Sequence, residues 1–190
     1  MKNIPANTSP GLYPRIVGDT WSDLAAPVQR FHMLAKQYQG TGLFTVRHGP
    51  GFLARLVAKL MRLPAAGEKV PVKLIVDVND EGEHWNRKFA DRPFITTQGE
   101  RAGGLLTERV GLMEIWYRLI VADQALRYEQ AKASLRLGAL RIPLPRFLAP
   151  NISAREWAME DGSGVNVSVS VTAPLVGLLI NYTGYIVSED

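Results

Sequence analysis

The chain has 190 residues, of which 46% are hydrophobic and 21% are charged. This is the mix of an ordinary soluble globular domain with enough apolar material for one sizeable core, so we expect a single domain over residues 1–190 with an extended lead-in over residues 1–14. The sequence contains no cysteine. That excludes a disulfide scaffold and cysteine catalysis and is typical of a reducing compartment, so we expect a cytoplasmic protein.

Charge and hydropathy exclude several other classes of protein. The formal net charge is only +4, from 22 basic and 18 acidic residues, and most basic residues are interleaved with acidic ones, whereas nucleic-acid-binding chains more often carry a basic run with exposed aromatic residues. Residues 1–20 contain no apolar run of signal-peptide length, and no stretch approaches the roughly 20 apolar residues of a membrane-spanning helix. We therefore expect no nucleic-acid partner and no integral membrane segment.

The first expected element is a helix over residues 20–38, in which apolar residues fall on one face at helical spacing. Pro27 is unfavourable in the interior of a helix and would mark a restart. We expect Gly40 and Gly42 to end this helix, and a short strand to follow over residues 43–48.

A second helix is expected over residues 52–63, after the break at residues 49–51. One side of it carries a basic stripe of Arg55, Lys59 and Arg62. The other side carries an apolar stripe made of Leu53, Leu56, Val57 and Leu60. A basic stripe on an amphipathic helix is most often an ordinary solvated face, and the alternative is contact with anionic lipid.

From residue 70 onward the hydrophobic period changes to two, which is typical of half-buried strands. A hairpin signal lies at residues 79–82. Prolines exclude a central strand over residues 140–150, because proline lacks the N–H that a ladder needs. The later strands are expected over residues 83–90, 94–98, 105–109, 112–122, 126–137, 155–160, 165–172 and 178–187.

The predicted fold class is α+β and β-rich: an antiparallel meander forming a barrel or half-barrel, with the two N-terminal helices packed on it. Residues 140–150 would then be either a crossover that closes one end of the barrel or a gate over a ligand pocket. The sequence shows neither βαβ alternation nor a glycine-rich phosphate loop. A dinucleotide site is therefore disfavoured, and no cofactor is expected.

The strand that follows the hairpin has an unusual inner face. Alternation places Glu83, Trp85, Arg87 and Phe89 on one side, and the polar residues between them take the solvated side. Two charges that point inward need partners, because desolvating an unpaired charge costs several kcal/mol. Either Glu83 and Arg87 form a structural pair that braces the barrel beneath Trp85, or Arg87 is a bidentate anchor for a carboxylate or phosphate.

Two further carboxylates belong to this question. If Glu108 or Glu156 points inward near Arg87, the barrel holds a polar cluster, which is either a structural network or a site for acid–base chemistry. The candidate ligand-binding residues are therefore Arg87, Glu83, Trp85, Glu108 and Glu156, and no catalytic residue is assigned.

The histidines do not add a metal site to these candidates. His32, His48 and His84 are not spaced as ligands within one element. His32 adjoins the apolar face of the first helix and is expected in the core or at its boundary, whereas His84 is expected to be exposed.

The order of short motifs along nearly the whole chain resembles the domain of unknown function 4166 family, a group of bacterial domains. The N-terminal half contributes Leu12-Tyr13-Pro14, Phe31-His32, Val46-Arg47-His48-Gly49, Leu63-Pro64 and the Glu83-Trp85-Arg87-Phe89 run. The C-terminal half contributes Glu108 and Gly111, Pro143-Leu144-Pro145, Pro150, Ala154-Arg155-Glu156, Pro174, Gly177, Tyr182 and Gly184. The resemblance supplies no catalytic residue and assigns no role to His48. The resemblance implies an association with NAD(P)-dependent dehydrogenase-like domains, because some family members are appended to such domains.

Three functions are compatible with these patterns. The first is binding of a small amphipathic or lipid-like ligand in a β-barrel cavity. The second is a small-molecule enzyme that uses an inward carboxylate–arginine cluster. The third, which rests only on the family's domain company, is an accessory domain for an NAD(P)-dependent reductase.

Overall fold

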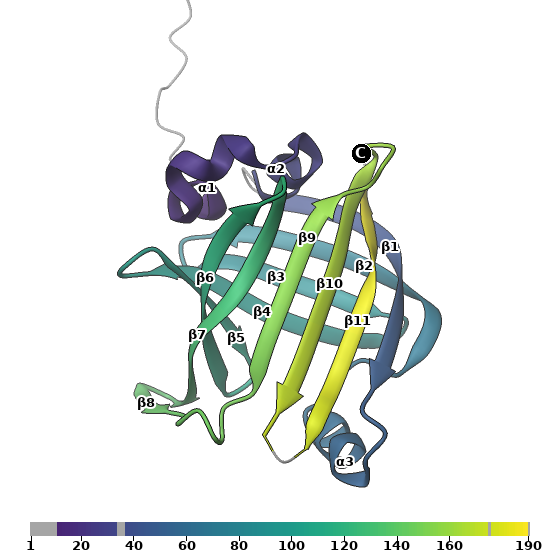
Figure 1. Ribbon diagram of the computed structural model, residues 1–190, viewed down its shortest axis with the longest axis vertical. Coiled ribbons are helices and arrows are strands. Elements are labelled where there is room, and N and C mark those ends of the chain that lie inside the picture. The colour runs from purple at the N-terminus through teal and green to yellow at the C-terminus, as the bar shows by residue number, and fades with distance from the viewer. Residues whose placement is uncertain (1–10, 34–36, 175, 190) are drawn as a thin grey trace, which may run out of the picture.

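The computed structural model describes residues 11–33, 37–174 and 176–189, and these contain the helices α1 (Leu12–Val17), α2 (Ala26–His32) and α3 (Phe52–Leu60), with a 3-10 helix, η1 (Gly18–Asp23), between the first two (Figure 1). The remaining elements are strands: β1 (Gln37–His48), β2 (Gly67–Asn79), β3 (Gly82–Phe89), β4 (Arg92–Arg101), β5 (Leu105–Val110), β6 (Met113–Ala122), β7 (Ala125–Leu137), β8 (Leu140–Pro143), β9 (Asn151–Ala158), β10 (Gly164–Ala173) and β11 (Gly177–Ser188).

Ten of these strands form a closed antiparallel barrel. Their order is β6-β5-β4-β3-β2-β1-β11-β10-β9-β7, and pairing of β6 with β7 closes the ring, while β8 is an extra strand on β7. In Figure 1 the front strands β9, β10 and β11 cross the back strands β2, β3 and β4 at a steep angle, so the barrel is strongly twisted. The predicted meander is confirmed, and it closes completely rather than stopping as a half-barrel.

The barrel core follows from the alternation of apolar residues in the strands. On β2, Val72, Leu74 and Val76 are almost fully buried, and they face the interior opposite the buried residues of β3. The turn between the two strands is at the predicted place, with Asn79 paired to Gly82. A Cβ atom at Gly82 would lie 2.0 Å from the carbonyl oxygen of Gln98 on β4, so this corner requires glycine.

The N-terminal helix prediction is wrong in its bounds. Residues 20–38 do not form one helix: η1 ends at Asp23, α2 starts at Ala26, and β1 begins at Gln37, while residues 34–36 lie outside the described part. Pro27 lies in the first turn of α2, where its missing N–H costs no hydrogen bond, so the expected restart is confirmed. The lead-in also ends earlier than predicted, because α1 starts at Leu12.

Gly40 and Gly42 do not end a helix but lie inside β1, where strand β11 comes very close. A Cβ atom on Gly42 would lie 1.6 Å from the carbonyl oxygen of Tyr185. Glycine has no Cβ, so the two backbones can approach at a point that no other residue would allow. The strand expected at residues 43–48 therefore starts six residues earlier, at Gln37.

Helices α1 and α2 cover one end of the barrel, the upper end in Figure 1. Tyr13 on α1 and Val28, Phe31 and His32 on α2 are buried there. Helix α3 lies at the opposite end, beside β11 and β1. None of the described helices is long and apolar enough to cross a membrane.

The proline-containing segment over residues 140–150 is only partly irregular. Leu140–Pro143 forms β8, which pairs with the last residues of β7 at the edge of the barrel wall, in agreement with the expectation that it is not a central strand. Strand β9 then begins at Asn151, four residues before the predicted start at residue 155.

Candidate functional site

Strand β3 presents its predicted inner face to the barrel interior. Glu83, Trp85 and Phe89 are buried, and Arg87 between them is half-buried. Strands β2 and β4 flank β3 on its two sides, which makes it an internal strand of the wall. The alternation of the sequence therefore places both charges inward, as expected.

Arg87 lies beside Glu108 rather than Glu83. Its Nη1 atom donates a hydrogen bond of 2.9 Å to Oγ1 of Thr96 and lies 3.7 Å from Oε1 of Glu108. The guanidinium carbon is 4.8 Å from the centre of the Trp85 ring. The Glu83 carboxylate instead accepts a 3.0 Å hydrogen bond from Nε1 of Trp85. The expected Glu83–Arg87 brace is thus replaced by a Glu83–Trp85 bond and an Arg87–Glu108 approach.

A hydrogen-bond network extends from Glu108 towards the helix-covered end of the barrel. Oε1 of Glu108 accepts a hydrogen bond from Gln98 at 3.3 Å, and Oε2 accepts one from the Tyr117 hydroxyl at 3.5 Å. The other side of the Gln98 amide accepts a 2.7 Å hydrogen bond from Tyr13 of α1. The carboxylate beside Arg87 is therefore connected to the N-terminal helices.

The network continues from Tyr13 to a buried acid–histidine pair. The Tyr128 hydroxyl lies 3.2 Å from the Tyr13 hydroxyl and 3.0 Å from Oε2 of Glu156. It has one proton, and a carboxylate is the stronger acceptor, so Tyr128 donates to Glu156. Nε2 of His32 lies 2.5 Å from the same Glu156 oxygen. The His32 ring also stacks on Tyr13, with 3.7 Å between ring centres.

Burial shifts the pKa values of several groups in and around this network. It raises the pKa of Glu83, an effect that the nearby His32 and the Trp85 hydrogen bond oppose. Burial also raises the pKa of Tyr182 to about 12 and raises the pKa values of Tyr13 and Tyr128 well above their ordinary value. The three phenols consequently remain protonated at neutral pH, and Tyr13 and Tyr128 donate hydrogen bonds to Gln98 and Glu156.

A cavity of about 70 Å³ lies inside the barrel next to this network. Its polar lining includes Arg87, Gln98, Glu108 and Glu156. Its apolar lining comes from Phe31, Phe44, Val72, Leu74, Trp85, Phe89, Ile152, Ala154, Val167, Val169 and Ile186, and three tyrosines add both kinds of surface. Arg87 and Glu108 keep 16% and 17% of their side chains exposed. Two of the charged groups that line the cavity are therefore partly accessible to solvent.

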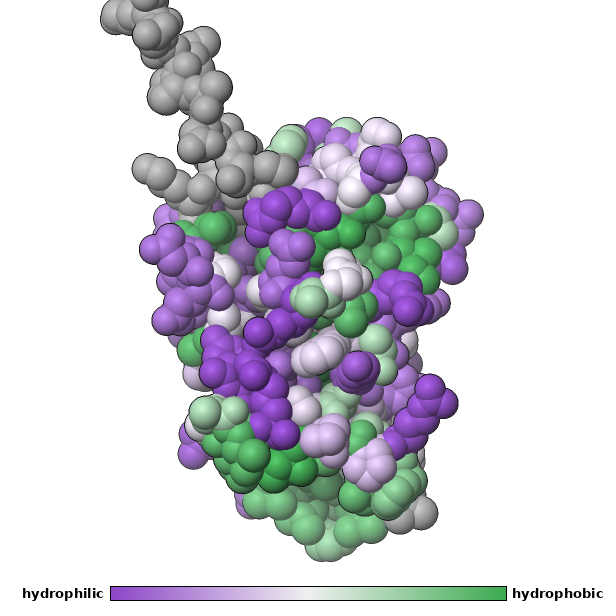
Figure 2. Space-filling model, turned by 90° about the vertical axis from the view of Figure 1, so that its left-hand side faces the viewer, coloured by the Kyte–Doolittle hydropathy of each residue, from purple (hydrophilic) through white to green (hydrophobic). Residues whose placement is uncertain are grey.

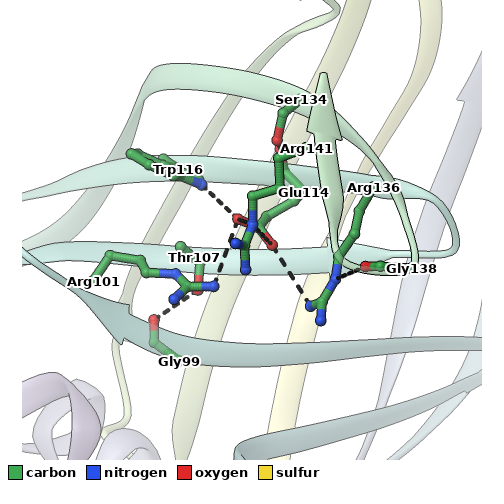
Figure 3. Close-up of polar contacts among 9 residues, drawn as sticks. All are labelled: Gly99, Arg101, Thr107, Glu114, Trp116, Ser134, Arg136, Gly138 and Arg141. Carbon is green, nitrogen blue, oxygen red and sulfur yellow. Dashed lines mark hydrogen bonds and ion pairs between the residues drawn. The ribbon is translucent and has the colours of Figure 1, made fainter. Parts of the chain in front are cut away.

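A second polar cluster lies on the outside of the barrel, around Glu114 (Figure 3). This carboxylate is fully buried, yet three arginines reach it: Arg141 at 3.1 Å and Arg101 and Arg136 at 3.8 Å. Nε1 of Trp116 donates a further hydrogen bond of 3.0 Å. Burial alone would raise the pKa of Glu114, but the hydrogen bonds from Trp116 and Arg141 lower it below its ordinary value.

The Glu114 cluster ties the β7–β8 hairpin to the barrel wall, since its arginines come from β4, β7 and β8. It borders a wide cleft of about 1080 Å³ that also contains acidic residues such as Asp80, Glu81 and Glu100. This cleft is larger than the inner cavity, but it is open and its charges are mixed. The inner cavity combines apolar walls with a few converging polar groups, which is the usual character of a small-molecule site.

The structure brings most of the predicted site residues together. Arg87, Trp85, Glu108 and Glu156 line the inner cavity, whereas Glu83 lies outside its lining and borders the outer cleft. Their role in binding a ligand stays a prediction. His84, expected to be exposed, is half-buried, and its Nδ1 lies 3.3 Å from the Thr97 hydroxyl.

Several residues of the inner network and of the Glu114 cluster were not predicted. Tyr13, Gln98, Tyr128 and Glu114 carry no signal in the local pattern of the sequence, and His32 was expected only as a core residue. The one available hint was the place of Tyr13 and His32 in the short motifs shared with a family. Their contacts join elements far apart in the chain, so no local spacing could show them.

Comparison with known proteins gives one result. No curated protein and no solved structure matches the chain. A family model described as domain of unknown function (DUF4166) matches residues 24–186, which covers most of the chain and nearly all of the barrel. The chain therefore belongs to the DUF4166 family.

Proposed function

We propose that the barrel binds a small amphipathic molecule whose carboxylate or phosphate group is held by Arg87. The observation that carries this proposal is the incomplete pairing of the guanidinium. Among the described residues, Thr96 is its one hydrogen-bond acceptor, and Glu108, at 3.7 Å, lies beyond normal hydrogen-bond length. A guanidinium has five N–H donors in a fork that matches an oxyanion in a bidentate manner. The remaining donors are available to a ligand in the cavity.

The cavity also supports the apolar part of the ligand and limits its size. Side chains such as Phe31, Val167 and Val169 offer an apolar wall opposite the polar groups. Its volume of about 70 Å³ is well below the roughly 300–1,000 Å³ of sites for drug-sized molecules. The ligand that fits this conformation is short, for example a short-chain carboxylate, and a lipid-length tail would require the barrel to widen.

Titration with a series of carboxylates from acetate to hexanoate, followed by calorimetry or NMR, tests the proposal and shows which chain length the cavity of about 70 Å³ accepts. We expect wild-type protein to bind, Arg87→Met to lose at least tenfold in affinity, and Lys88→Met to bind as wild type. Lys88 is the matched control, because it is an exposed cation on the outer face of the same strand. Equal binding by wild type and Arg87→Met would show that Arg87 is not the anchor. Thr96→Val tests the same point should Arg87→Met not fold, because it removes the hydrogen bond that orients the guanidinium.

A second candidate function is an enzyme acting on a small molecule. It is favoured by one observation: two carboxylates, Glu108 and Glu156, line the same cavity as Arg87. Native mass spectrometry of gently purified protein would identify the bound molecule, and incubation with Glu156→Gln would then separate binding from turnover. Conversion by wild type but not by Glu156→Gln, at equal binding, supports the enzyme. Association with a separate reductase stays a prediction that a pull-down can test.

A further inference from the structure

Helix α3 packs on the barrel with its small residues, although its sequence pattern favours burial of the large apolar residues. The two residues buried against β1 and β11 are the small ones, Ala54 and Ala58, which are 0% and 3% exposed. The large apolar residues point away from the protein: Phe52 and Leu60 are each 73% exposed. An amphipathic helix whose only role is to pack on a core would bury these large apolar residues.

Helical geometry shows that Phe52, Leu56 and Leu60 face directly away from the barrel. Leu56 is two residues from both Ala54 and Ala58, so at about 100° per residue it points about 160° away from each of them. Phe52 and Leu60 lie one turn before and after Leu56 on the same side. These three residues therefore form a continuous apolar edge on the outside of the molecule.

The charges on α3 and in the turn after it are all positive. Arg55, Lys59 and Arg62 are exposed, and the sequence from residue 49 to 67 contains no aspartate or glutamate. In the part of the chain that the structure describes, none of the three cations forms an ion pair. They are thus available to a negatively charged surface next to the apolar edge.

A second exposed apolar segment lies at the same end of the molecule. Strand β8 and the turn after it are at the lower end in Figure 1, as α3 is, and Figure 2 shows hydrophobic side chains gathered there. The segment exposes Leu140, Ile142, Phe147 and Leu148, by 40% to 69%. Arg146 beside them is also exposed. This end of the barrel therefore combines apolar residues with cations over two separate elements.

We propose that α3 docks this end of the barrel on the surface of a membrane that contains anionic lipid. The exposed apolar edge would enter the boundary between headgroups and acyl chains, with the helix parallel to the surface, while Arg55, Lys59 and Arg62 contact lipid phosphates. The barrel would stand on the other side of α3, held by Ala54 and Ala58. A second copy of the chain is a poorer occupant, because two α3 helices face to face would bring their six cations together.

Sedimentation with vesicles tests this proposal on the full chain. We expect wild-type protein to sediment with vesicles of phosphatidylcholine and phosphatidylglycerol, and much less with phosphatidylcholine alone. Phe52→Ser combined with Leu60→Ser should lower the partition coefficient roughly tenfold for each residue. Lys59→Gln combined with Arg62→Gln should lower it about fivefold for each cation, on anionic vesicles only.

Met33→Ser is the matched control, since Met33 is 59% exposed at the end of α2, on the opposite side of the barrel. It should bind vesicles as wild type does, and so should Arg87→Met, which keeps this test separate from ligand binding in the cavity. Thermal melts verify that each variant is folded. Wild-type binding no stronger than that of the Phe52/Leu60 double variant would overturn the proposal. So would a change of oligomeric state, rather than of vesicle binding, in that variant, since α3 would then be an interface between copies.

Discussion

Nε2 of His32 lies 2.5 Å from Oε2 of Glu156, although 124 positions separate the two residues in the chain. His32 belongs to α2, which covers one end of the barrel, and Glu156 belongs to β9 in the wall. The contact therefore fixes the N-terminal helices over this end of the barrel. It also places the last polar group of the network against the cavity, since Glu156 lines it.

His32→Leu and Glu156→Leu should each destabilise the fold by about 1–3 kcal/mol, because the first removes one of the two polar contacts of Glu156 and the second leaves His32 and the Tyr128 hydroxyl without their shared acceptor. The double variant should cost less than the sum of the two, since each single variant already loses the His32–Glu156 contact. Urea unfolding at equilibrium measures all three, with Ser153→Ala on the exposed face of β9 as the control. Strict additivity would mean that the pair is not coupled.

Glu83→Gln should stabilise the protein increasingly as pH rises. Burial raises the pKa of Glu83 above its ordinary value of 4.5, so above 4.5 the folded state holds a proton that the unfolded state releases. Stability from this group is complete below 4.5 and is lost as pH rises through the folded pKa. Glutamine can still accept the Trp85 hydrogen bond and carries no charge. Melting temperatures of wild type and Glu83→Gln over a pH series measure the difference.

Glu114→Gln should show the opposite pH dependence. The folded pKa of Glu114 is lowered by its hydrogen bonds, so its contribution is present above the unfolded value of 4.5 and is lost as pH falls through the folded pKa. We expect a loss of about 1–3 kcal/mol at neutral pH, because a hydrogen-bonded charge is removed from beside three arginines. Chemical denaturation should show this loss shrinking below 4.5. A loss independent of pH would point to packing instead.

Arg87→Met should leave the fold intact. Arg87 has one hydrogen bond within the described residues, and Glu108 keeps its bonds from Gln98 and Tyr117 without it. We therefore expect a change in unfolding free energy below about 2 kcal/mol. Circular dichroism and urea titration check this. A variant that fails to fold would identify Arg87 as a structural brace.

Gly42→Ala should destabilise the barrel by about 3 kcal/mol or more, because its Cβ would overlap a carbonyl oxygen of β11 that cannot move alone. Gly51→Ala is the control: its Cβ would meet no atom within 4 Å, and its φ of −69° suits alanine. A comparable loss in both variants would contradict this explanation.

The sequence alone determined the local features of this protein. Alternation in β2, β3 and β10 was sufficient to predict half-buried antiparallel strands and the inward side of Arg87, because the side-chain period of a strand depends only on its own backbone. The hairpin at residues 79–82 followed from turn chemistry.

Only the tertiary structure decided which residues meet. Closure of the barrel sets Glu108 rather than Glu83 beside Arg87, and it brings His32 to Glu156 across the chain. It also turns Ala54 and Ala58 of α3 inward and leaves Phe52, Leu56 and Leu60 outside. These outcomes depend on contacts between distant segments, whose geometry is fixed by packing and strand register and leaves no periodic trace in the sequence.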